Sequence, residues 1–380
     1  MMKSRPLTPK LAFASDNTST MSVNACAAFL EAQKERYHAP YGNDRWTRQA
    51  EELCRELFEL DSILVSFVPT GTAANCLGFL QTVPAGSGIV ASARAHIVTD
   101  ERGAPHFFTG NAVLPMVANQ GRIDASDLEV LFRRSDSHYS SPSVVTITQS
   151  TELGTVYSAG DMQTLREQRR RLGFRLHIDG ARFANALAHL GARPKELTWL
   201  QDVDFMSLGV TKNGSGLGEA IIFFDPELGA KFISIQKQAG QLMSKMWMAT
   251  APIVGLLRGG QECEFLTNAM HSNEMAQLLA KRIRCIFNDL DGTTDVIAYP
   301  VEANAVFVKL RDDVLNSLRT RGWVINDFIG GNPRLMCSWA TTHEDIEDLV
   351  ADLAESIEQA PKMRDRQVEG RSLVERKYAS

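Results

Sequence analysis

The sequence predicts an α/β protein with a mostly parallel sheet, helices on both faces of that sheet, and a smaller C-terminal α+β domain. Between residues 62 and 224, short apolar runs alternate with longer amphipathic segments, as strands and helices do in parallel sheets. After residue 262 a long helical pattern replaces this alternation. With 380 residues, 44% of them hydrophobic, the chain can form two cores. We predict an N-terminal segment and helix (1–36), a large domain (37–262), a small domain (263–362) and a charged tail (363–380).

The first two elements expected along the chain are helices. Residues 22–37 begin with Ser22, a typical capping residue, and residues 45–58 carry apolar side chains on one face. The alternating region then predicts strands over 62–68, 143–149, 174–179, 203–209 and 219–224. Helices are expected over 71–83, 161–173 and 180–191.

The small domain is expected to combine long helices with short strands. Its pattern predicts helices over 264–288, 312–321 and 342–359. Strand candidates and further apolar stretches occupy 295–300, 305–310, 322–328 and 334–340.

Charge and cysteine content exclude several classes of protein. The net charge is −5 and the basic residues are dispersed, so we expect no nucleic-acid partner. The six cysteines form no C-x-x-C pair, which argues against a zinc site or a disulfide framework, and we expect no metal. No apolar run has the length of a signal peptide core or a membrane span, so we expect a cytoplasmic protein without a membrane partner.

The first candidate for chemistry follows the strand at 62–68. Pro69 ends that strand and the turn Thr70-Gly71-Thr72 leads into a helix, whose free amides and positive dipole end suit a phosphate group. The stretch has neither the Gly-Lys-Ser/Thr of a Walker loop nor a G-x-G-x-x-G pattern. The alternative is a plain helix capped by Thr70 or Thr72.

The second candidate is Asp179, at the junction of the strand at 174–179 and the next helix. The alternative role for Asp179 is to cap that helix. Arg182, however, places a cation in the first helical turn, where it opposes the helix dipole and calls for an anion nearby. An acid that can pair with a pyridinium nitrogen, close to an arginine that can grip a carboxylate, suits pyridoxal phosphate chemistry.

The third candidate is Lys212, which follows the strand at 203–209. Asn213-Gly214 is a strong hairpin signal, so Lys212 read alone is a solvated lysine beside a turn. Together with Asp179 and the Thr-Gly-Thr turn, Lys212 is instead the amine that pyridoxal phosphate chemistry requires, and Thr211 offers a further phosphate contact. The joint occurrence favours the second reading.

These motifs resemble a known family. The "TGT" turn, "HIDGAR" and "GVTKNG", with "SDN" at 15–17 and "YGND" at 41–44, are similar to the low-specificity L-threonine aldolases of the β-eliminating lyase group. That group has the aminotransferase-like fold type I of pyridoxal phosphate enzymes, and the resemblance runs from about residue 13 to 342. It implies pyridoxal 5'-phosphate as cofactor and retro-aldol cleavage of L-threonine, L-allo-threonine and related amino acids to glycine and an aldehyde. It also implies a homotetramer built from dimers.

The resemblance assigns roles to individual residues. Lys212 would carry the Schiff base, and Asp179 would pair with the pyridinium nitrogen. His96 would stack on the cofactor ring, and His138 would lie near the substrate hydroxyl, so that either histidine could be the base. The remaining assignments are the phosphate (Gly71, Thr72, Thr211), the phenolic oxygen of the cofactor (Gln149) and the substrate carboxylate (Ser15, Arg182, Arg334). Read without the family, His96 would be a surface histidine and Arg334 an ordinary strand residue.

The sequence departs from many relatives at two places. Gln149-Ser150-Thr151 stands where many members have Glu-Asn-Thr, and "KQAGQLMSK" at 237–245 replaces a glycine-rich stretch. The altered stretch at 237–245 leaves open a preference for phenylserine. Other reactions on the same fold also stay open: β-elimination, transamination and racemisation. A non-catalytic binding protein is the alternative from a different class.

Overall fold

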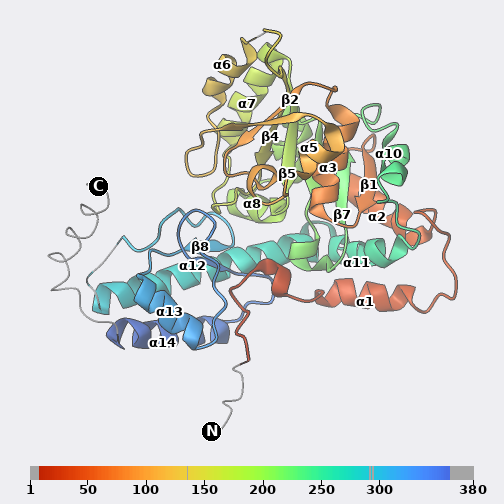
Figure 1. Cartoon of the computed structure of the whole chain (residues 1–380). Helices are drawn as coiled ribbons and strands as arrows, with labels where there is room; N and C mark the ends of the chain where they lie inside the picture. Colours follow the sequence, from red (N-terminus) through yellow and green to blue (C-terminus); the bar gives the residue numbers. More distant parts are fainter. Residues whose placement is uncertain (1–7, 135, 291, 293–294, 360–380) are drawn as a thin grey trace, which may run out of the picture.

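The computed structural model describes residues 8–134, 136–290, 292 and 295–359 (Figure 1). Its centre is a seven-stranded sheet of order β1-β7-β6-β5-β4-β2-β3. The strands are β1 (Leu64–Val68), β2 (Gly88–Ser92), β3 (Ala112–Met116), β4 (Pro142–Thr148), β5 (Arg175–Gly180), β6 (Phe205–Leu208) and β7 (Glu219–Phe223). Only β7 runs antiparallel to its neighbours β1 and β6, so the prediction of a mostly parallel α/β sheet is confirmed.

Strands β2 and β3 were not predicted from the sequence. β2 reads GIVAS and includes one glycine and two other small residues, and β3 reads AVLPM with Pro115 inside it. Glycine and proline both weaken the sequence signal of a strand. Pro115 is tolerated because β3 lies at the edge of the sheet.

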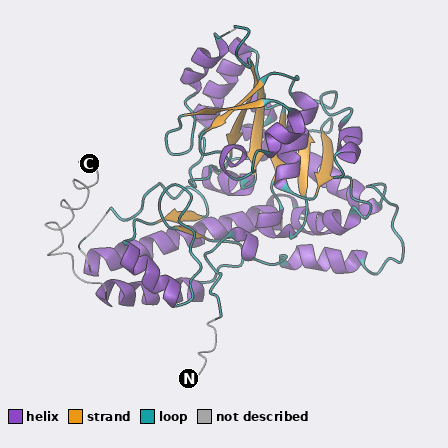
Figure 2. Cartoon of the chain, in the orientation of Figure 1, coloured by secondary structure: helices purple, strands orange, loops and turns teal. Residues whose placement is uncertain are grey.

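Helices cover both faces of the sheet, as Figure 2 shows. Along β7, Ile221 belongs to one apolar core and Ile222 to another, because successive side chains of a strand point to opposite faces. The core around Ile221 includes residues of α3 (Gly71–Thr82) and α10 (Phe232–Gln238), with α5 (Ala104–Thr109) packed against it. The core around Ile222 includes residues of α2 (Arg45–Phe58), α7 (Ala159–Leu172), α8 (Phe183–Leu190) and α11 (Trp247–Leu257).

The N-terminal helix α1 (Val23–Ala32) packs along α11 and is shorter than the 22–37 expected from its pattern. Ser22 is the N-cap residue of α1, as its type suggests, but its side chain makes no capping hydrogen bond and its hydroxyl donates to Glu264 instead. Short elements complete this part of the fold: η1 (Asp16–Thr18), α4 (His96–Thr99), η2 (Ala125–Asp127), α6 (Leu128–Phe132), α9 (Pro194–Leu197), η3 (Trp199–Gln201), η4 (Thr211–Ser215) and η5 (Gly260–Glu262).

The long helix α12 (Glu264–Leu290) runs from beneath the large sheet to the C-terminal helices (Figure 1). It packs against α8 and α11 at one end and against α14 at the other. The C-terminal elements are β8 (Ala305–Phe307), α13 (Asp312–Thr320), β9 (Arg334–Met336) and α14 (His343–Gln359). A third core joins them and includes Phe13 of the N-terminal segment. Because α12 belongs to both parts, the boundary at 262/263 stays a prediction.

Two expected strands of the small domain are reduced to isolated bridges. Within 295–300 only Ile297 pairs, with Val308, and within 322–328 Trp323 and Asn326 make isolated bridges. The tail predicted over 363–380 lies outside the described residues. In the described part of the chain, no helix combines the length and apolar character that crossing a bilayer requires. All six cysteines are free thiols.

The turn at Asn213-Gly214 is not the tight hairpin that its dipeptide suggests. β6 and β7 are antiparallel neighbours, but the wide connection between them contains the π-helical turn η4. The side chain of Asn213 donates to the carbonyl of Phe265 at 2.5 Å, and a Cβ on Gly214 would lie 2.8 Å from that of Ser22. Gly214 has φ of +119°, so glycine is required here both by conformation and by space.

Candidate active site

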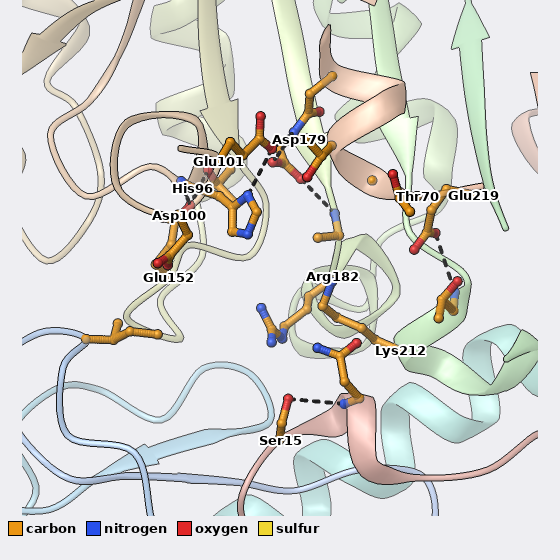
Figure 3. Close-up of a pocket in the computed structure, with 18 of the residues that line it drawn as sticks. Ser15, Thr70, His96, Asp100, Glu101, Glu152, Asp179, Arg182, Lys212 and Glu219 are labelled. Atoms are coloured by element: carbon orange, nitrogen blue, oxygen red, sulfur yellow. Dashed lines mark hydrogen bonds and ion pairs between the residues drawn. The ribbon is translucent and has the colours of Figure 1, made fainter. Parts of the chain in front are cut away.

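A cavity of about 500 Å³ opens at the carboxyl ends of the parallel strands (Figure 3). At this end of the sheet β1, β2, β4, β5 and β6 finish and the antiparallel β7 begins. Each strand end delivers side chains to the cavity, as expected for ligand sites of open α/β sheets. The opposite side of the cavity comes from the N-terminal segment and the small domain, through Ser15, Asn17, Asn326, Phe328, Ile329 and Arg334.

The N-terminus of α3 faces this cavity. Thr70 is the N-cap, and its Oγ1 accepts a hydrogen bond from the amide of Ala73 at 3.2 Å. The amides of Gly71 and Thr72 lie in the first turn, where backbone N–H groups have no partner within the helix. Both residues line the cavity, so the helix is capped by Thr70 and still offers two free donors to an anion.

Asp179 is buried at the end of β5. Its Oδ2 accepts a hydrogen bond from Nδ2 of Asn75 at 2.9 Å, and its Oδ1 accepts one from the amide of Ala181 at 3.1 Å. Asp179 is not the cap of α8, because Arg182 occupies the N-cap position. Asn75 also donates to Glu101 Oε1 at 3.0 Å, so one amide group holds two buried carboxylates.

Lys212 lies in η4 and projects into the cavity (Figure 3). Beside it, the buried Glu219 accepts a hydrogen bond from the amide of Val210 at 2.6 Å. Burial raises the pKa of Glu219, and the charge of Lys212 counteracts that shift. The hydroxyl of Thr211 donates to the carbonyl of Gly218 at 2.8 Å, so its proton is already used within the protein.

His96 begins α4 and forms a pair with Glu101. Its Nδ1 lies 2.9 Å from Glu101 Oε1; the carboxylate is fully buried and the imidazole is 44% exposed. The hydrogen bond to Glu101 raises the pKa of His96 against the opposing effect of burial, and Asp179 adds to the rise. With Nδ1 directed at Glu101, Nε2 is the nitrogen left for a ligand.

The two arginines predicted to bind the substrate carboxylate have different surroundings. Arg182 donates to both oxygens of Asp16, at 2.7 and 2.9 Å. Arg334 is 8% exposed, and within the described ranges it has no ion pair and its Nε has no hydrogen-bond partner. Burial, with the charge of Arg182, lowers the pKa of Arg334 to about 10. The anion that Arg182 called for is therefore Asp16, whereas Arg334 remains an unpaired cation beside the cavity.

Two of the predicted site residues do not reach this cavity. Gln149 follows β4, but it is fully buried and its amide bonds the backbone N–H and C=O of Tyr157, at 3.0 and 2.9 Å. One of its two amide N–H groups is thus bonded to the protein backbone, and the fully buried side chain does not line the cavity. His138 lies in an exposed turn before β4, at the opposite end of that strand from the cavity, so its expected place near the substrate hydroxyl is corrected.

Several residues of the site were not identified from the sequence: Asp16, Asn75, Glu101, Glu152 and Glu219. Glu152 carried a usable signal, since it follows a predicted strand as closely as Lys212 does. Asp16 lies inside the quoted "SDN" motif. Nothing in the local sequence distinguishes Glu101 from a surface acid. Over the described ranges, no group of three His, Cys, Asp or Glu side chains is arranged to hold a metal ion.

Comparisons with known proteins agree with this geometry. The β-eliminating lyase family model matches residues 12–313. The chain is 43% identical over 344 residues to the low specificity L-threonine aldolase of a Pseudomonas species, covering 90% of this chain and 96% of that enzyme. The structure of Leishmania major threonine aldolase has a TM-score of 0.82 at 25% identity and covers 91% of this chain and 99% of its own.

A more distant structure identifies the fold class. Thermus thermophilus aspartate aminotransferase has a TM-score of 0.65 at 16% identity and covers 91% of both chains. At that identity it shows the fold alone, and it confirms the aminotransferase-like fold type I. With the family match over most of its length, the chain belongs to the β-eliminating lyase family.

Proposed function

We propose that this chain is a pyridoxal phosphate-dependent aldolase that cleaves L-threonine, L-allo-threonine and related β-hydroxy-α-amino acids to glycine and an aldehyde. The observation that carries the proposal is the convergence of Lys212, Asp179, the free amides at the start of α3 and the unpaired Arg334 on one cavity. The names of the Pseudomonas and Leishmania relatives, both threonine aldolases, support it.

The residues present fit pyridoxal phosphate. Lys212 would supply the amine that holds the cofactor aldehyde, and the amides of Gly71 and Thr72 would bind its phosphate. Asp179 would face the ring nitrogen, and His96 would lie against the ring. When bound, the cofactor supplies an electron sink that stabilises the negative charge left on Cα when the Cα–Cβ bond breaks.

The substrate is held through its carboxylate. Among the described residues Arg334 has no ion pair, so this guanidinium would make the main ion pair, and the hydroxyl of Ser15 would add a donor. Arg182 would contribute through Nη1, because Nε and Nη2 already donate to Asp16. This grip would fix the orientation of the Cα–Cβ bond, which decides the bond that breaks.

A homotetramer in the cytoplasm completes the proposal. Three apolar side chains on and after α1 are exposed in a single chain: Val23 (74%), Leu30 (57%) and Tyr37 (78%). Exposed apolar side chains gathered on one helix and the segment that follows it suit a subunit interface. The six free thiols suit a reducing compartment. Light scattering on a size-exclusion column measures the oligomeric state.

The test of the function is an assay of products. The purified protein is incubated with pyridoxal phosphate and, separately, L-threonine, L-allo-threonine and L-phenylserine, and glycine, aldehyde and keto acid are measured together. Glycine and aldehyde in equal amounts are expected, with the ranking of the three substrates giving the side-chain preference. Keto acid without glycine would replace the aldolase by an eliminating lyase or a transaminase. Lys212→Ala is the control and should lose both turnover and the yellow absorbance of the bound cofactor.

A further inference from the structure

Glu152 is a carboxyl group of the cavity that the proposed function leaves without a role. It follows β4 and lines the cavity near His96 (Figure 3). Its Oε1 accepts hydrogen bonds from the amide of His96 at 2.8 Å and from Oγ1 of Thr148 at 2.9 Å. These two contacts fix the carboxyl group in place. In Figure 3 it lies on the opposite side of the cavity from Lys212.

The second oxygen of Glu152 has no such contacts. Oε2 is shielded from solvent, and among the residues that the structure describes it has no hydrogen-bond partner. A buried polar atom without a partner is costly unless a ligand or a proton satisfies it. Because Oε1 already accepts from two donors, a proton on this carboxyl group would reside on Oε2.

The charges around Glu152 come from several elements. Asp179 of β5 repels the ionised form, while Arg182, at the start of α8, attracts it. The amide of His96 in α4 donates to it, and Tyr157 lies in the same loop. Burial, followed by the charge of Asp179, raises the pKa of Glu152 to about 7. A group with that pKa can take up and release a proton near neutral pH.

His96 is the other candidate for this task. Its Nδ1 is bonded to Glu101, which raises its pKa and favours the imidazolium. An imidazolium has no free lone pair, so in that form His96 can donate a hydrogen bond but cannot accept a proton. The geometry leaves Oε2 of Glu152 as the vacant acceptor on this side of the cavity.

We propose that Oε2 of Glu152 accepts the β-hydroxyl proton of the substrate during Cα–Cβ cleavage, an inference that rests on the proposed aldolase function. As the proton moves to Oε2, the electron pair of the O–H bond becomes the second bond of the aldehyde carbonyl. The pair of the Cα–Cβ bond stays on Cα, which then takes up a proton from the ammonium form of Lys212, and Lys212 regains a proton from solvent. Glu152 returns its proton to solvent when the aldehyde leaves, so atoms and electrons balance without a further reagent.

The test compares two reactions in the same holoenzyme. Glu152→Gln keeps the shape of the side chain but cannot accept a proton, so cleavage of L-threonine should fall by about 10²- to 10⁴-fold. Exchange of the α-hydrogen of glycine with deuterium from the solvent needs no β-hydroxyl group, and it should stay within a few-fold of the wild-type rate. Glu152→Asp, which keeps the carboxyl group, should recover part of the cleavage.

Other outcomes contradict the assignment. Cleavage near the wild-type rate in Glu152→Gln would show that another group is the base, while the aldolase function would stand. Loss of glycine exchange or of cofactor absorbance together with cleavage would mean a general structural role and overturn the proposal. Absence of cleavage in the wild-type protein would overturn the aldolase function itself, and this assignment with it.

A second readout does not depend on turnover. Infrared spectra of the wild-type holoenzyme, compared with Glu152→Gln, should contain a protonated-carboxyl signal that disappears over about pH 6 to 8. The profile of kcat/KM should rise with pH over the same range, and His96→Gln should keep that rise even though its rate is lower. A Glu152 carboxyl that is fully ionised at pH 5 would contradict the proposal.

Discussion

Arg182 and Arg334 border the same cavity and both are largely buried, but their partners differ. Arg182 makes a two-point ion pair with Asp16, whose carboxylate is 2% exposed and also accepts from Nδ2 of Asn304 at 3.1 Å. Arg334 has no acidic partner in the described part of the chain. One arginine therefore fixes the N-terminal segment to the start of α8, and the other keeps its charge for a ligand.

The difference shows how the position of an acid decides what an arginine does. A buried ion pair is stable only while both partners are present, since removing one leaves an uncompensated charge. An unpaired buried guanidinium is already in that state, so the carboxylate of a substrate can recover the lost interaction. Removing Asp16 should therefore damage the fold, and removing Arg334 should damage binding.

The largest expected effect is that of Asp16→Asn. It leaves Arg182 buried without its counter-charge and should lower the free energy of unfolding by about 3–5 kcal/mol. The matched control is Asp313→Asn, because Asp313 forms the same two-point pair with Arg311 on the surface. That change should lower the free energy of unfolding by under about 1 kcal/mol. Urea unfolding measures the stability of both variants. Equal losses of stability would show that the buried pair with Arg182 contributes no more than the surface pair.

Arg334→Gln should act on binding and hardly on stability. Losing the ion pair to the substrate carboxylate should raise KM by about 100-fold, whereas the free energy of unfolding should stay the same or rise because a buried unpaired charge is removed. Arg182→Gln should mainly lower the free energy of unfolding, with a smaller rise in KM from the loss of its Nη1 contact to the substrate carboxylate. If Arg334→Gln unfolds easily and keeps its KM, the distinction between the two arginines is wrong.

Sequence patterns identified the part of the site that follows the strands. Asp179 lies at the end of a strand that the alternating pattern predicted, and Lys212 and the Thr-Gly-Thr turn closely follow two other predicted strands. Parallel strands end at one edge, so their following residues converge whatever the details of the packing. His138 was misplaced even though the same rule applied, since it precedes the strand at 143–149 and had to lie at the other edge.

The rest of the site depends on contacts that the local sequence does not contain. Whether Arg182 is paired depends on Asp16, which lies 166 residues away in the chain. Gln149 was predicted as the last residue of its strand and lies directly after it, yet its amide is used by the backbone of Tyr157. Arg334 is unpaired because none of the described residues packed around it places a carboxylate within ion-pair distance. Such residues could be proposed only by resemblance to a family.

Acid should selectively remove the stability that the ion pair between Asp16 and Arg182 contributes. Burial alone would raise the pKa of Asp16, but the charge and hydrogen bonds of Arg182 hold it below the ordinary value of 3.8. The stabilisation is therefore fully present above pH 3.8 and is lost as the pH falls through the lower pKa of the folded state. The stability gap between wild type and Asp16→Asn should narrow over that range in urea unfolding. A gap that is constant with pH would mean that the ionisation of Asp16 does not contribute.

The smallest expected effect is that of Asn304→Ala. Asn304 donates from Nδ2 to Asp16 and, at 2.8 Å, to the carbonyl of Cys337, so it connects the ion pair to the small domain. The pair with Arg182 survives the change, and the loss of these hydrogen bonds should lower the free energy of unfolding by about 1 kcal/mol. In the Asp16→Asn background, Asn304→Ala should lower the free energy of unfolding by less, because the carboxylate charge that strengthens the hydrogen bond from Asn304 is gone. Equal costs in both backgrounds would show that Asn304 supports the backbone of the small domain and contributes nothing to the ion pair.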